Sequence, residues 1–115
     1  MPELISIVAE LPAIDFPATK TFCRDVLGGE LLAEYPDFLI YKINGIELHY
    51  WLCDNKNLPE ASSIYLRVRD IDGFYEKYKN SGHVVLSLET RPWGIKEFYL
   101  QDSNGILYKF GEDIS

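Results

Sequence analysis

The sequence predicts an α+β fold in which the order βαβββ occurs twice, over residues 4–53 and 62–112 of a single domain. Short runs of β-branched and aromatic residues recur in both halves, and one helical segment follows the first run of each. The dipeptide Ile-Asp opens both helical segments, at 14–15 and 71–72, and Asn-Gly-Ile precedes both last strands, at 44–46 and 104–106. Because both signals recur in the same order, we favour a duplication over an unrepeated α+β sandwich.

The first half begins with an apolar run at residues 4–11, which we expect to form a strand that Pro12 ends. Asp15 is suited to capping the helix that follows, and Gly28 to ending it. Phe22, Val26 and Cys23 are expected on its buried side. The other strands of this half are expected at residues 30–35, 38–43 and 46–52.

The second half follows residues 54–60, which carry turn formers and charges without periodicity and are expected to be a linker. A strand is expected at 63–69, and then a helix that Asp70 or Asp72 caps and Gly82 ends. The remaining strands are expected at residues 84–88, 95–100 and 106–110, with a tight turn at 102–105.

Composition limits the partners of the chain. Eighteen acidic and 11 basic residues give a formal charge of −7, which argues against nucleic acid and favours cationic ligands. Aromatic residues make up 14% of the chain, so either an aromatic-lined cavity or an aromatic core is expected. Cys23 and Cys53 lack disulfide or metal spacing, and no apolar run approaches the roughly 20 residues that span a bilayer. We therefore expect a cytoplasmic protein without a membrane partner.

The final hairpin carries a recognisable pattern: Pro92-Trp93-Gly94, then Glu97-Phe98, then Asp102 and Gly105 at the turn. Together with the helix end FCRDVLG at residues 22–28, this pattern resembles the bleomycin resistance branch of the glyoxalase and vicinal-oxygen-chelate superfamily. The resemblance implies two βαβββ modules whose mixed sheets curl into a cup. It also implies a homodimer in which the cups form between subunits.

Enzymes of the superfamily hold a divalent metal with four side chains, and the resemblance places these positions at Val8, Glu47, Ser63 and Lys109. Only Glu47 is a credible ligand, because valine has no donor atom and a lysine ammonium repels a cation. His49 shares a strand face with Glu47, and the pair could chelate only weakly. We therefore expect no metal, no cofactor and no catalytic residues. The alternative is a metal-dependent glyoxalase-like or dioxygenase-like enzyme with an atypical site on Glu47 and His49.

Strand alternation and the resemblance together predict the ligand site. Glu47, His49 and Trp51 share one face, whereas Tyr65 and Arg67 share a face with Lys109 in the second half. Phe38 and Trp93 stand where bleomycin resistance proteins place the rings that sandwich a flat ligand. The predicted ligand-binding residues are Phe38, Glu47, His49, Trp51, Tyr65, Arg67, Trp93 and Lys109.

Each of these residues has a structural alternative. Trp93 could cover a sheet edge, Phe38 and Tyr65 could belong to the core, and Glu47 could pair with Lys109. We expect a non-catalytic protein that sequesters a small aromatic compound such as bleomycin. Because Arg67 would oppose a cationic drug, another flat or partly anionic molecule is a second candidate ligand. A sensor or partner-binding domain is a third possibility for the function.

Overall fold

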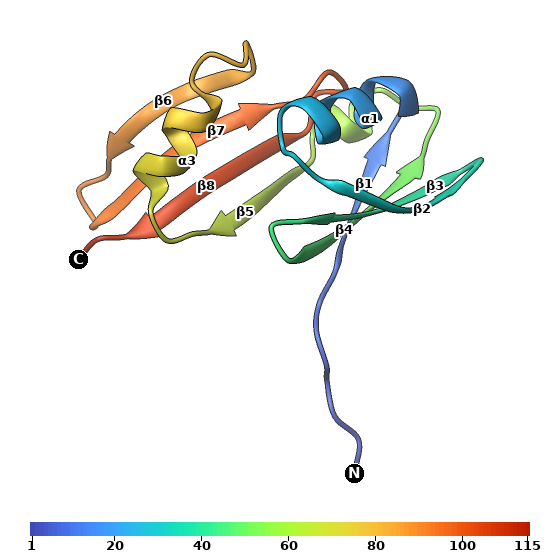
Figure 1. The fold of residues 1–115 in the computed structure, drawn as a ribbon, viewed down its shortest axis with the longest axis horizontal. Coiled ribbons are helices and arrows are strands. Elements are labelled where there is room, and N and C mark those ends of the chain that lie inside the picture. The colour runs from blue at the N-terminus through green and yellow to red at the C-terminus, as the bar shows by residue number, and fades with distance from the viewer.

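The protein folds as two four-stranded mixed sheets with a helix against one face of each (Figure 1). The computed structural model describes residues 1–115. The first sheet has the strand order β1-β4-β3-β2 and the second has the corresponding order β5-β8-β7-β6. In each sheet the first strand pairs in parallel with the last, and the other neighbours are antiparallel. The predicted α+β class and the doubled βαβββ order are confirmed.

The first sheet is formed by β1 (Ala9–Ala13), β2 (Glu30–Tyr35), β3 (Phe38–Ile43) and β4 (Ile46–Leu52). Positive φ angles at Asn44 (50°) and Gly45 (81°) form the tight turn between β3 and β4, as the sequence predicts. The helix α1 (Phe16–Asp25) starts at Asp15, whose carboxylate accepts from the Ala18 N–H at 3.0 Å. The helix ends before Gly28. Gly28 has a φ angle of 67°, which glycine adopts without strain.

The predicted first strand is wrong at both ends. Residues 1–8 form no strand and extend away from the two sheets (Figure 1), because Ala9 already lies opposite Leu48, near the beginning of β4. By this register, residues 1–6 would lie beyond the start of β4 at Ile46, where no neighbouring strand can form hydrogen bonds with them. The strand also continues through Pro12 to Ala13, since β1 is an edge strand and an edge position tolerates the missing N–H of proline.

The second sheet is formed by β5 (Ser63–Arg67), β6 (Val84–Thr90), β7 (Ile95–Gln101) and β8 (Leu107–Asp113). Its helix α3 (Ile71–Tyr78) is capped by Asp70, whose carboxylate accepts from the Gly73 N–H at 3.2 Å. The predicted strand at 63–69 ends two residues early, because Asp70 adopts a left-handed conformation and turns the chain into the helix. A short helix, α2 (Asn57–Glu60), lies inside the predicted linker.

No helix in the protein is long and apolar enough to cross a membrane.

One apolar core of 17 buried residues lies between the helices and the sheets. Phe22 and Cys23 of α1 are buried as predicted, whereas Val26 is only partly buried. Burial raises the pKa of the Cys23 thiol to about 12, so this cysteine is a protonated packing residue that contacts the Tyr50 hydroxyl at 3.6 Å.

Two polar contacts join the halves of the molecule. The hydroxyls of Tyr50 on β4 and Tyr108 on β8 lie 2.7 Å apart, and the Tyr108 hydroxyl lies 2.7 Å from the Asp102 carboxylate. Near them, the Asn104 side-chain oxygen accepts from the N–H groups of Ile14 and Asp15 at 3.0 and 2.9 Å. The loop before β8 therefore holds the start of α1.

Replacing Asn104 with alanine should lower the free energy of unfolding by about 1 to 3 kcal/mol, because two backbone N–H groups lose their acceptor. Urea denaturation of the two proteins would measure this. The control is Ser103→Ala, since the Ser103 side chain is exposed and forms no hydrogen bond; it should change stability by less than about 0.5 kcal/mol. Equal effects of the two substitutions would show that Asn104 does not join the halves.

Candidate functional site

The faces of the two sheets that point away from the core carry seven of the eight sequence-predicted residues, and the eighth, Trp93, lies in a turn. Along β4, Leu48 and Tyr50 point into the core, so Glu47, His49 and Trp51 point to the opposite face. On β8, Tyr108 and Phe110 are buried, and Lys109 lies between them on the opposite face. We call these surfaces face A, on the first sheet, and face B, on the second.

Face A brings four of the predicted residues together, namely Phe38, Glu47, His49 and Trp51. Phe38 lies opposite Trp51 in the β3–β4 register. Its ring centroid is 5.2 Å from that of His49, in an edge-on arrangement. Glu47 forms an ion pair with the Nε2 atom of His49. Phe38 is only partly buried, so it is not a core residue as the alternative expectation had it.

Sequence reasoning missed Glu10 on face A. Its carboxylate lies 3.3 Å from the Nδ1 atom of His49, because Glu10 and His49 are register partners in the β1–β4 pair. The resemblance to the superfamily places the metal-ligand position of the first strand at Val8. In the structure Val8 precedes β1. The parallel register, which only the folded chain shows, decides which residue of β1 adjoins His49.

The pKa of His49 is raised because, although partial burial opposes protonation, hydrogen bonds to Glu47 and Glu10 favour the imidazolium ion. Both ring nitrogens face carboxylates, so both act as donors in the protonated ring. No group of three or more His, Cys, Asp or Glu side chains in the protein is arranged to hold a metal ion. The residues of face A therefore fit a hydrogen-bonded charge cluster better than a set of metal ligands.

Face B carries Tyr65, Arg67 and Lys109 of the predicted set. Tyr65 lies opposite Lys109 in the β5–β8 register and is 45% exposed, so it too is not a core residue. The Arg67 guanidinium lies 5.9 Å from the Tyr65 ring centroid, and the Lys109 ammonium lies 5.3 Å from that of Tyr99. Neither Arg67 nor Lys109 forms an ion pair within the chain. The expected alternative of a Glu47–Lys109 pair is therefore wrong for the single chain.

Trp93 lies in the turn between β6 and β7 and is 67% exposed. The Arg91 guanidinium lies 6.0 Å from its ring centroid. No hydrogen bond, ion pair or ring contact joins Trp93 to Phe38, or any predicted residue of face A to one of face B. One chain therefore does not form the expected aromatic sandwich.

A second residue that sequence reasoning missed organises face B. Glu97 of β7 is only 5% exposed and accepts hydrogen bonds from Tyr65, Arg91 and Tyr99 at 3.0, 2.8 and 3.2 Å. Burial alone would raise the pKa of Glu97, but these three donors lower it. The signal in the sequence is the alternation of Glu97 and Tyr99 with the apolar Phe98 and Leu100.

Gly111 allows this arrangement, because the Tyr65 side chain crosses β8 directly over its backbone. A Cβ atom at position 111 would lie 1.9 Å from the Tyr65 hydroxyl oxygen. Any side chain there would force Tyr65 away from Glu97. The glycine is therefore part of the geometry of face B.

The family model of the glyoxalase/bleomycin resistance protein/dioxygenase superfamily matches residues 5–110. The chain belongs to this superfamily. No match was found among curated proteins.

Solved structures of the superfamily share the fold. The bleomycin-binding protein of the bleomycin producer Streptomyces verticillus, complexed with copper(II)-bleomycin, is 24% identical with a TM-score of 0.81, over 96% of this chain and 97% of that one. A bleomycin resistance determinant encoded on the transposon Tn5 is 21% identical, with a TM-score of 0.82. The match covers 96% of this chain and 98% of that one. A glyoxalase/bleomycin resistance protein/dioxygenase from Alicyclobacillus acidocaldarius is 23% identical, with a TM-score of 0.77. The match covers 95% of this chain and 91% of that one.

The charge cluster on face A makes a testable prediction about His49. Its pKa, measured by NMR titration, should lie above the ordinary value of about 6.5 and should fall in Glu47→Gln, which removes one of the two carboxylates. The control Glu30→Gln, on the edge strand β2, should leave the titration unchanged.

The sign of the linked stability follows from the raised pKa. Protonated His49 stabilises the folded protein fully when the pH lies below the histidine pKa of the unfolded chain, about 6.5. This contribution is lost as the pH rises through the pKa of His49 in the folded protein. A His49 pKa at or below the ordinary value, or one that does not respond to Glu47→Gln, would contradict the cluster.

Proposed function

We propose that this protein sequesters a flat aromatic compound of the bleomycin type without catalysing a reaction on it. The observation that carries the proposal is the pair of faces A and B, each of which presents aromatic rings beside charged side chains. The similarity to the copper(II)-bleomycin complex, over nearly the full length of both chains, supports a ligand of this kind. The proposed binding residues are Phe38, Glu47, His49, Trp51, Tyr65, Arg67, Trp93 and Lys109.

The charges of the two faces constrain the ligand. Face A presents the carboxylates of Glu10 and Glu47, whereas face B presents the unpaired cations of Arg67 and Lys109. A ligand that contacts both faces is therefore expected to carry cationic and anionic groups on an aromatic body. Stacking on an exposed ring adds about 0.5 to 1.5 kcal/mol beyond simple burial.

We further propose that two copies assemble so that face A of each lies against face B of the other. A twofold dimer of this kind forms two identical chambers, and the opposite charges of the faces favour it. Large apolar side chains on and near the first sheet are also exposed, as expected of an interface: Leu31, Leu32, Tyr35, Ile46, Trp51 and Leu52. The unpaired thiols of Cys23 and Cys53 are consistent with sequestration in the cytoplasm.

Titration calorimetry with metal-free and copper-loaded bleomycin tests the ligand. We expect micromolar binding of at least one form, and a loss of about tenfold in affinity for Trp93→Ala or Phe38→Ala because each removes an aromatic contact. The control Leu58→Ala removes an exposed apolar side chain in α2, outside both faces, and should bind as the unmodified protein does. The absence of heat with either form up to millimolar ligand would reject bleomycin.

A charge exchange tests the dimer. Sedimentation should give twice the chain mass of 13.3 kDa, and the single variants Glu47→Lys and Lys109→Glu should each weaken association because like charges then face one another. The double variant should recover much of the association, since the pairing is restored in reverse. A monomer at all concentrations, or no recovery in the double variant, would contradict this arrangement.

A metal-dependent enzyme with an atypical site on Glu47 and His49 is the second candidate, and the contact between these two side chains is the observation in its favour. A metal could bind there only if it displaced a carboxylate from a ring nitrogen of His49. Metal analysis of the purified protein separates the candidates. Stoichiometric zinc, nickel, manganese or iron that is lost in Glu47→Ala would support the enzyme.

A further inference from the structure

A cavity of about 340 Å³ lies between the two halves, on the core side of the sheets, and Arg67 of face B stands at its edge. Leu48 of β4, Leu66 of β5 and Phe110 of β8 line it, and these residues alternate with those of the two faces. Ten of the 13 lining residues are hydrophobic, and none is acidic. The volume lies at the small end of the range for ligand pockets, which is about 300 to 1,000 Å³.

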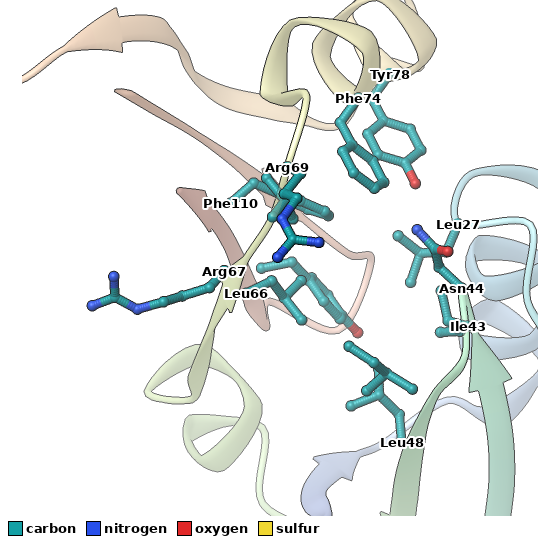
Figure 2. Close-up of a pocket in the computed structure, with 13 residues that line it drawn as sticks. Leu27, Ile43, Asn44, Leu48, Leu66, Arg67, Arg69, Phe74, Tyr78 and Phe110 are labelled. Atoms are coloured by element: carbon teal, nitrogen blue, oxygen red, sulfur yellow. The ribbon is translucent and has the colours of Figure 1, made fainter. Parts of the chain in front are cut away.

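Two of the polar groups that line this cavity and form no hydrogen bond are those of Tyr78 and Arg69. Tyr78 of α3 is only 2% exposed, yet its hydroxyl forms no hydrogen bond, and Figure 2 shows it directed into the space bordered by Leu27 and Asn44. Arg69 follows β5 and forms neither a hydrogen bond nor an ion pair. Its guanidinium extends over the cavity, whereas that of Arg67 points away (Figure 2).

No buried side-chain nitrogen or oxygen of the protein lacks a partner, so the unbonded Tyr78 hydroxyl is not sealed in the core and is accessible from the cavity. The other hydroxyl of the lining, that of Tyr108, is already bonded to Asp102 and lies beside Tyr50. The Tyr78 hydroxyl and the Asn44 amide therefore supply free hydrogen-bonding groups of the wall, and Arg69 supplies a cation at the opening. An anionic group in the cavity could accept from these donors.

We propose that this cavity binds a small apolar molecule with one terminal carboxylate, of the short fatty acid type. The chain of such a molecule would contact Leu48, Leu66 and Phe110, and its carboxylate would accept from Arg69 and from the Tyr78 hydroxyl. The absence of acidic residues from the lining excludes electrostatic opposition from the wall itself, despite the net charge of −7. The site borders face B at Arg67, but the proposal does not depend on the function proposed for the two faces.

Octanoate is the probe, with 1-octanol and octylammonium as matched molecules that remove or reverse the charge. Calorimetry should show octanoate binding at least about tenfold more tightly than octanol, and octylammonium should not bind, because a charge-assisted bond to Arg69 is lost in both. NMR shifts of backbone amides should be largest at Leu66, Val68 and Tyr78. Similar affinity for the three probes, or shifts confined to faces A and B, would overturn the proposal.

Two variants locate the carboxylate. Arg69→Ala should weaken octanoate binding by about tenfold, and Tyr78→Phe, which removes only the hydroxyl, should weaken it severalfold. Arg24→Ala removes an exposed arginine of α1 that does not line the cavity, so octanoate affinity should not change. Equal effects of the two arginine variants would refute the assigned geometry.

The same experiment separates a ligand from a second copy of the chain. If octanoate does not bind, and the amides of residues 66–68 are protected from hydrogen exchange only at protein concentrations that give a dimer, the cavity is an interface and the proposal fails. Whether bleomycin binds does not bear on this test, because octanoate is titrated without it.

Discussion

The contact between the Tyr50 and Tyr108 hydroxyls, 2.7 Å apart in the core, holds the two sheets in one relative orientation. Both side chains are fully buried, so burial raises their pKa values well above the ordinary value and the hydroxyls remain neutral donors. Asp102 accepts from Tyr108, and it also accepts from three backbone N–H groups of its own turn. This polar join, the Asn104 contacts and the apolar core together connect the half that carries face A to the half that carries face B.

The alternation of side chains along the strands gives the two sides of each sheet different chemistry. The core side packs against the helices and leaves an apolar cavity where the two halves meet. The opposite side presents charges and aromatic rings to solvent in the single chain. The two proposed sites therefore differ in kind: in the proposed assembly the faces of two copies enclose a ligand, whereas the cavity is formed by one chain.

Each face has one central side chain that hydrogen-bonds to its polar neighbours, Glu97 on face B and His49 on face A. Glu97 directs Tyr65, Tyr99 and Arg91 on face B, and this leaves Arg67 and Lys109 as cations without carboxylate partners. His49 has the corresponding central place on face A, between two carboxylates. The two halves thus share a topology but present opposite charges, which is the basis for the dimer proposed above.

The sequence by itself determined the class of the fold, the order of the elements and the face on which most candidate residues lie. These features are local, because turn formers such as Asn44-Gly45, caps such as Asp15 and period-two alternation act over a few neighbouring residues. The true bounds of the first strand, the place of Glu10 beside His49 and the grouping of Tyr65 around Glu97 were decided by the tertiary structure. Each depends on the register between strands distant in the sequence, and no local pattern specifies that register.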